Sequence, residues 1–240
     1  MVQNISINQV STIASQLSNR TKNMKNSLLT IALILCTVVS IFAQDSAYQK
    51  AMKKEIDKLN IADSLSKYQQ SANGFARISQ LNPNEWQPYY YNALAYVYQG
   101  LDNSLDLNKK DEALAKAEEL IKKAEAISPN NSEIVTLEGF KIMAEVSADP
   151  ASRGQSLSGT VMYTFGKAMK MDPQNPRASL LMGQMEFGMA GFFKSGTEKA
   201  CGLVKQSQAI FAAQDDEALK AKLAPTWGRA FAEKSAKACQ

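Results

Sequence analysis

A proline-centred break recurs three times along the chain at nearly equal spacing, and this repeat constrains the fold more than any other feature. Each break ends one helix-forming run and starts the next after polar residues rich in asparagine, in the segments FARISQLNPNEW, IKKAEAISPNNSEI and FGKAMKMDPQNPRA. The prolines Pro83, Pro129 and Pro173 lie 46 and 44 residues apart. A period of this size with two helices in each unit is typical of a helical repeat array.

The runs between these breaks favour helices throughout. Helix-forming and apolar residues recur at spacings of three and four, and no stretch alternates as a strand would. We therefore expect an all-α chain whose residues 44–240 form a single repeat domain, with Trp227 covering the end of the array. The expected elements are helix pairs over about 46–80, 85–127, 132–171 and 176–213, and a C-terminal helix over about 225–238.

The helices around the breaks resemble the tetratricopeptide repeat (TPR) family. The second-helix pattern of that family is matched at Ala117, Ile121, Ala124 and Pro129, at Phe165, Ala168 and Pro173, and less closely at Phe75 and Pro83. The small residue that lets paired helices approach falls ten residues after each proline, at Ala93, Gly139 and Gly183. The resemblance implies hairpins stacked into a right-handed α-α superhelix, a TPR-like solenoid whose concave face binds protein segments. The chain also resembles small secreted TPR-like proteins of Bacteroidetes-type bacteria.

The period here is about ten residues longer than the 34-residue period of that family. The additional residues fall between the two helices of each hairpin, at Gly100–Asp111, Ser147–Gly159 and Met189–Lys199. In a solenoid, insertions at equivalent positions emerge on the same edge. We therefore expect them to form a composite ledge beside the groove.

The N-terminal region reads as a leader for export. The apolar run from Leu28 to Phe42 follows Lys25, ends at the small residue Ala43, and is shorter than the ~20 residues that a membrane-spanning helix needs. This order predicts a signal peptide within residues 1–43, cleaved after Ala43, with a probable translation start at Met24. We expect a periplasmic or secreted protein with no membrane insertion after cleavage.

Composition excludes several function classes. The chain has no histidine, so Ser-His-Asp and Cys-His catalysis is impossible, and its carboxylates lie mostly in lysine-interleaved helical runs typical of a solvated face. The loop DNSLDLN from Asp102 lacks the glycine and the glutamate of a calcium site. Cleavage of the leader removes three basic residues and no acidic one, from totals of 27 and 23, so nothing favours nucleic-acid binding. We expect no enzyme activity, cofactor or metal.

Two cysteines, Cys201 and Cys239, remain after the leader is removed, in a compartment that permits disulfides. A bridge between them would close a loop of nearly forty residues. Spacing alone does not show whether their Cα atoms approach, so the sequence leaves a disulfide and two free thiols equally open.

The concave face is the candidate binding surface. If the repeat register holds, the first helix of each unit presents inward the residues Tyr90, Leu94, Tyr98, Thr136, Phe140, Met143, Leu180, Gln184 and Phe187. This groove is apolar and aromatic, which suits an amphipathic or extended apolar peptide; the sequence leaves open whether it is free or filled by neighbouring segments. We expect a non-catalytic protein–protein interaction or scaffold module with a protein or peptide partner in the cell envelope. The alternative is a periplasmic binding protein that holds a small molecule or glycan on its aromatic residues.

Overall fold

A computed structural model describes residues 47–239. The expected signal peptide, its cleavage after Ala43 and the start at Met24 lie outside these residues. Residues from Gln49 onward form one compact unit, which contains all the numbered helices. The described residues contain helices and no strand, so the predicted all-α class is confirmed for them.

The helices follow one another with short connections. Residues 47–60 are helical and precede the first numbered helix. The numbered helices are α2 (Leu65–Leu81), α3 (Trp86–Gly100), α4 (Leu107–Ile127), α5 (Ser132–Ala148), α6 (Pro150–Met171), α7 (Pro176–Phe193), α8 (Glu198–Ala213), α9 (Asp216–Ala221) and α10 (Arg229–Ala236), with a final 3-10 turn η1 (Lys237–Cys239). The expected C-terminal helix is shorter than predicted, because an irregular segment that contains Trp227 precedes α10.

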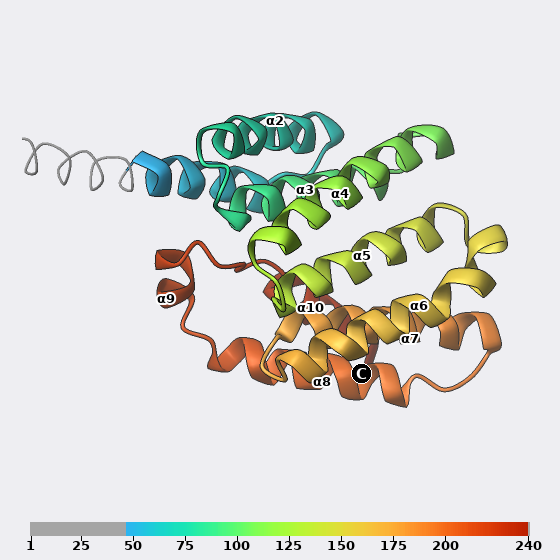
Figure 1. Cartoon of the computed structure of the whole chain (residues 1–240). Helices are drawn as coiled ribbons and strands as arrows, with labels where there is room; N and C mark the ends of the chain where they lie inside the picture. The colour runs from blue at the N-terminus through green and yellow to red at the C-terminus, as the bar shows by residue number, and fades with distance from the viewer. Residues whose placement is uncertain (1–46, 240) are drawn as a thin grey trace, which may run out of the picture. The chain divides into compact units, whose positions relative to one another are not determined.

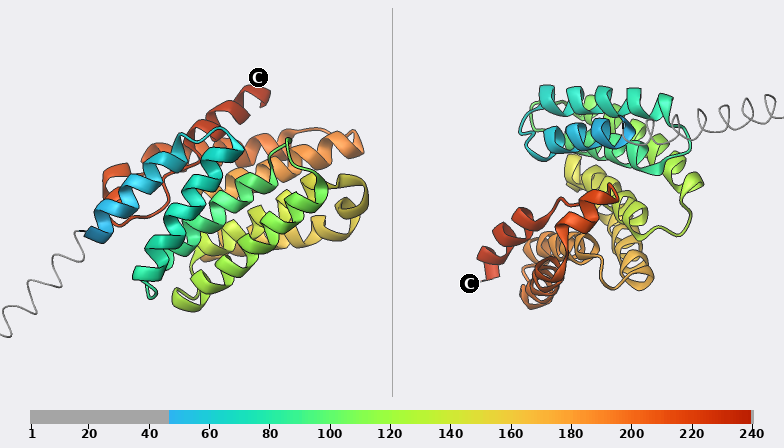
Figure 2. Two further views of the ribbon diagram at one scale, coloured as in Figure 1. Left: turned by 90° about the horizontal axis from the view of Figure 1, so that it is seen from above. Right: turned by 90° about the vertical axis from the view of Figure 1, so that its left-hand side faces the viewer.

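Consecutive helices pack as hairpins, α3 with α4, α5 with α6 and α7 with α8 (Figure 1). The first helices of these hairpins, α3, α5 and α7, also contact one another in order, so they form an inner row, and α10 returns to pack on α8. Figure 2 shows the hairpins stacked side by side with roughly aligned axes. In Figure 1 the turns within the three hairpins lie at the same edge.

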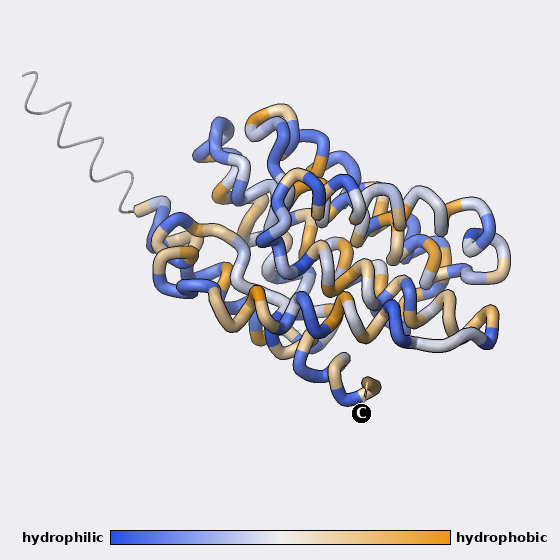
Figure 3. The backbone as a smooth tube through the Cα atoms, turned by 90° about the horizontal axis from the view of Figure 1, so that it is seen from below, coloured by the Kyte–Doolittle hydropathy of each residue, from blue (hydrophilic) through white to orange (hydrophobic). Residues whose placement is uncertain are grey.

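The second and third repeated breaks start helices with a capping residue after the proline, whereas Glu85 after the first break makes no such hydrogen bond. Asn131 accepts a hydrogen bond from the backbone N–H of Glu133 at 3.0 Å, and Asn175 accepts one from that of Arg177 at 3.0 Å. Side-chain oxygens at this position satisfy backbone donors that have no partner within the helix. Hydrophobic and hydrophilic residues then alternate in short stretches along the helices (Figure 3), which gives each helix an apolar face to bury.

The second of the three insertions, at the edge where we expect a ledge, does not form a loop. Nearly all residues of the second insertion, Ser147–Gly159, are helical, and Asp149 alone separates α5 from α6. The Asp149 side chain accepts a hydrogen bond from the backbone N–H of Ser152 at 3.2 Å, and Pro150 takes the first helical position, so a new helix starts at once. The second insertion therefore lengthens the helices at the hairpin edge, whereas the first and third keep short connections at residues 101–106 and 194–197. Among the described residues, none of the helices is both long and apolar enough to cross a membrane.

A glycine lets α5 and α6 approach closely. A Cβ atom at Gly139 would lie 2.6 Å from Cε1 of Phe165, a ring that is fully buried. Such a distance is too short for a carbon–carbon contact, so a larger residue forces the packing to shift.

We predict that Gly139→Ala lowers the free energy of unfolding by about 1–3 kcal/mol, because the added methyl group overpacks the contact with Phe165. The measurement is urea denaturation followed by circular dichroism. Gly166→Ala in α6 is the matched control, since its methyl group meets no atom closer than 4.0 Å. The control is expected to raise the free energy of unfolding by up to about 1 kcal/mol through helix propensity. Equal effects at the two glycines would contradict the close approach of α5 and α6.

Candidate functional site

The segment that joins α9 to α10 lies across the inner row of helices and fills one end of the groove. The hydroxyl of Tyr91 in α3 donates to the carbonyl oxygen of Ala224 at 3.0 Å. The indole Nε1 of Trp227 donates to the hydroxyl oxygen of Tyr90 at 3.0 Å, and its ring stacks on Phe140 of α5 with centroids 5.8 Å apart. The chain therefore occupies this end of its own concave face.

A buried arginine holds this segment in place. Nε and Nη2 of Arg177, at the start of α7, donate to the carboxylate of Glu133 in α5 at 2.8 and 2.6 Å, and Nη1 donates to the carbonyl oxygen of Trp227 at 3.1 Å. The guanidinium also lies 5.8 Å from the ring centroids of Phe211 and Trp227. Burial acts to lower the pKa of Arg177, but the charge and hydrogen bonds of Glu133 outweigh it and raise this pKa. The arginine therefore stays charged and links two repeats to the C-terminal segment.

A second polar network lies beside this ion pair and explains why other polar residues are buried. The Nδ2 group of Asn175 donates to Oγ of Ser132 at 3.0 Å and to Oγ1 of Thr136 at 3.2 Å. Ser132 in turn donates to the carbonyl oxygen of Ala168 at 3.0 Å. These bonds connect the starts of α5 and α7 with the end of α6. Thr136 is thus a structural residue of the repeat junction.

A disulfide ties the end of the chain to α8. Cys201 and Cys239 are bonded, with Cα atoms 5.6 Å apart and a sequence separation of 38 residues. A disulfide that closes a loop of this length lowers the conformational entropy of the unfolded chain, which stabilises the folded protein by roughly 4 kcal/mol. The disulfide therefore restrains the segment that carries Trp227, which lies within the closed loop.

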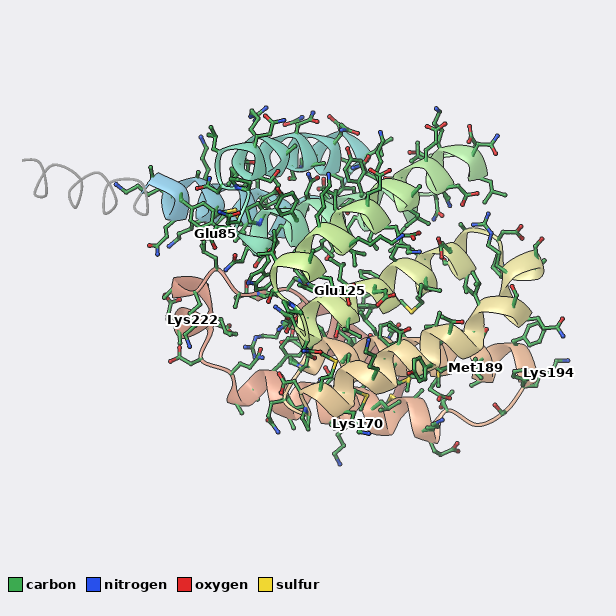
Figure 4. The ribbon with its side chains drawn as sticks, viewed as in Figure 1. Glu85, Glu125, Lys170, Met189, Lys194 and Lys222 are labelled. Atoms are coloured by element: carbon green, nitrogen blue, oxygen red, sulfur yellow. A yellow bond between two sulfur atoms is a disulfide. The ribbon has the colours of Figure 1, made fainter. Side chains whose placement is uncertain are left out.

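The other end of the groove is an open cavity of about 1070 Å³. It lies between the late turns of α3, α5 and α7, the first turns of α6, and the C-terminal segment with α10. Figure 4 labels one lining residue, Met189, and shows it near Lys194 at the end of α7. The lining residues, none of them charged, are Tyr98, Leu101, Phe140, Met143, Val146, Ser147, Pro150, Ala151, Gly154, Gln155, Ser158, Gln184, Met185, Gly188, Met189, Phe192, Phe193, Trp227, Gly228 and Phe231.

The inner end of the cavity is an aromatic wall. Phe140 and Trp227 stack with an interplanar angle of 22° and are 4% and 8% exposed. Tyr98 meets the edge of Phe140, with centroids 6.1 Å apart. Burial, and to a smaller extent the neighbouring Tyr68, raises the pKa of Tyr98, so its hydroxyl stays protonated at neutral pH. The wall is uncharged, and the Tyr90–Trp227 hydrogen bond holds the indole of Trp227 in place.

Half of the lining residues come from the three insertions. The second insertion supplies the residues from α6, including Pro150, Gly154 and Ser158, and the third supplies Met189, Phe192 and Phe193 of α7. The longer helices extend past the region filled by the C-terminal segment. The residues that exceed the usual repeat length therefore build the walls of the cavity.

The structure separates the nine expected groove residues into two groups. Tyr98, Phe140, Met143 and Gln184 line the cavity. Tyr90, Leu94, Thr136 and Leu180 are buried, each at most 1% exposed, and Phe187 packs against the apolar cluster that includes Leu180 and Phe211. The second group is covered because each inner helix has neighbours on both sides and the C-terminal segment lies over the early turns.

Sequence reasoning did not single out the lining residues from α6 and the end of α7. The segment MAGFF, from Met189 to Phe193, belongs to a predicted hairpin connection, although four of its five residues are apolar. Two adjacent phenylalanines in a segment expected to be exposed are the sequence signal that indicates a binding surface here.

The described residues contain no group of three or more cysteine or acidic side chains arranged to hold a metal ion. The chain as a whole has no histidine. The soft atoms that face the cavity are the thioether sulfurs of Met143, Met185 and Met189. The polar groups of the lining residues are amides and hydroxyls, such as those of Gln155 and Ser158.

Comparison with known proteins finds similarity at the level of solved structures. No family model matches the chain, and no curated protein sequence matches it. A similar solved structure is the HusA haemophore from Porphyromonas gingivalis, with a TM-score of 0.71 and 26% sequence identity over 82% of this chain and 94% of that chain. This likeness supports the predicted relation to small helical proteins of Bacteroidetes-type bacteria. Membership of the TPR family stays a prediction.

We predict that the Arg177–Glu133 pair is strongly coupled. Glu133→Gln leaves a buried guanidinium without its counter-charge and is expected to lower the free energy of unfolding by about 3–5 kcal/mol. Arg177→Met is destabilising too, since it also removes the bond to Trp227. The double variant is expected to lose clearly less than the sum of the two single losses, because no unpaired buried charge is left. Chemical denaturation of the wild type, the two single variants and the double variant measures their free energies of unfolding. Additive losses would contradict the coupling.

Proposed function

We propose that this chain is an exported, non-catalytic carrier that binds a porphyrin such as haem in the apolar cavity. The observation that carries the proposal is the uncharged cavity of about 1070 Å³ with the stacked Phe140–Trp227 wall at its inner end. The likeness to a haemophore, a protein that by its name carries haem, supports the choice of ligand. The sequence leaves a small-molecule binding protein as the alternative function. The present proposal is a form of that alternative in which the ligand is a porphyrin.

The dimensions and chemistry of the cavity suit a large flat apolar ligand. Its volume is at the upper end of the roughly 300–1,000 Å³ of sites that bury drug-sized molecules. The parts of Phe140 and Trp227 that border the cavity offer a macrocycle aromatic contact, and aromatic pairs add attraction beyond the area that they bury. The absence of charged lining residues means that ionised groups of the ligand, such as carboxylates, stay at the open mouth, because burying them unpaired is unfavourable.

Recognition rests on the macrocycle more than on iron. Without histidine the chain has no imidazole ligand to offer. The raised pKa of Tyr98 makes a phenolate ligand unfavourable there. The remaining donors are thioethers, from Met143, Met185 and Met189, which are soft ligands. The protein's own contribution is therefore apolar contact, stacking and exclusion of water.

We place the carrier in the periplasm or outside the cell, because the leader in residues 1–43 has the order of a signal peptide. We interpret the stacked hairpins of residues 44–240 as a right-handed TPR-like superhelix with expanded repeats. The scaffold function is less well supported, because Tyr90, Leu94 and Leu180 are buried and unavailable to a peptide.

We predict that filling the cavity blocks binding. Gly154→Leu places a side chain where a Cβ atom meets nothing within 4 Å on the cavity wall. It is expected to weaken haem binding by more than about tenfold without destabilising the protein. Gly159→Leu on the same helix is the matched control, since its Cβ also meets nothing but Gly159 does not line the cavity. Titration monitored by the haem absorption band and by tryptophan fluorescence measures both, and equal affinities in the two variants would place haem outside this cavity.

We also predict that iron is dispensable. Iron-free protoporphyrin IX is expected to bind within about tenfold of the affinity for haem, because the contacts are made by the ring. The measurement is quenching of tryptophan fluorescence, with Trp227 in the wall as the nearest reporter. Tight binding of haem together with no binding of the iron-free ring would show that a protein–iron bond carries recognition. No saturable binding of either would contradict the proposed function.

A further inference from the structure

Two adjacent phenylalanines at the end of α7 line the cavity and yet face solvent. Phe192 and Phe193 are 80% and 67% exposed, and their rings meet edge to face with centroids 5.0 Å apart. At the inner end of the same cavity, Phe140 and Trp227 are almost fully buried. The outer wall therefore consists of two large apolar side chains that have no apolar cover in the free protein.

The end of α7 that carries this pair is weakly held. Gly188 and Gly191 interrupt the last turns, and a Cβ atom at either one would meet nothing within 4 Å. Glycine within a helix leaves the backbone freer than any other residue does. Residues 191–199 are all exposed, so few tertiary contacts fix this stretch.

The helix ends in a turn that closes on itself. Lys194 adopts a left-handed backbone conformation with φ 53°, and the backbone N–H groups of Lys194 and Ser195 both donate to the carbonyl oxygen of Ala190. These bonds are local to the last turn and its cap. Ala190 itself is buried, but the turn from Gly191 to Ser195 is exposed and can therefore move as a unit, with both phenylalanines attached.

We propose that Phe192 and Phe193 close over the outer edge of the bound ligand by a movement of the last turn of α7. The inference rests on the proposed function and adds two positioning residues to it. The apolar rim of a macrocycle held against Phe140 and Trp227 gives the two exposed rings a surface to cover. Closure then buries both rings and slows escape of the ligand.

The test uses the Phe192→Ala/Phe193→Ala double variant and iron-free protoporphyrin IX as the probe. Both side chains are exposed, so the free variant is expected to fold and melt as the wild type does. The variant is expected to bind at least about tenfold more weakly, through faster dissociation measured by stopped-flow transfer to excess acceptor. Tyr163→Ala is the matched control, because Tyr163 is an aromatic residue of α6 that is 73% exposed and lies outside the cavity lining.

Hydrogen exchange separates closure from a passive wall. Backbone amides of residues 188–196 are expected to exchange more slowly in the wild type with the probe bound than without it. Binding by the wild type with an unchanged dissociation rate in the double variant and no slowed exchange would overturn the closing role and leave the proposed function intact. Absence of binding by the wild type would overturn both.

Discussion

The buried ion pair between Arg177 and Glu133 is the interaction on which the rest of the structure depends. A guanidinium that is 1% exposed is tolerable only when a counter-charge and further acceptors surround it. Here the acceptors come from α5 and from the carbonyl of Trp227, so the charge is satisfied only when two repeats and the C-terminal segment are all in place. The arginine thereby couples hairpin packing to the position of the chain's own end.

This coupling determines which part of the concave face is open to a ligand. The C-terminal segment, restrained by the Cys201–Cys239 disulfide, fills the end of the groove near the starts of the inner helices. The lengthened ends of α6 and α7 border the part that is left, and the result is a cavity with an open mouth in place of a continuous peptide groove. A cavity of this kind suits a compact apolar ligand better than an extended chain.

The fold was largely predictable because its signals are local. Proline followed by a capping residue such as Asn131 or Asn175 marks helix starts, and glycine at Gly139 marks a close helix pair; each acts through neighbours within a turn or one hairpin. The site was predictable only in part. Spacing placed Tyr98 and Phe140 on the inward stripe, but it placed Tyr90 there too, and nothing local distinguishes a residue covered by a distant segment from one left open.

The sequence by itself determined that the chain is helical, where the repeated breaks fall, that its pattern is that of an exported protein, and that histidine chemistry is impossible. These properties follow from residue types and short-range periodicity. Only the tertiary structure decided that the cysteines pair, that the C-terminal segment covers the early turns of the inner helices, and that Trp227 packs against Phe140 to form the wall of a cavity. The physical reason is that each of these depends on segments tens of residues or more apart meeting in space, and the contacts that bring them together involve burial and charge pairing that no single stretch of sequence contains.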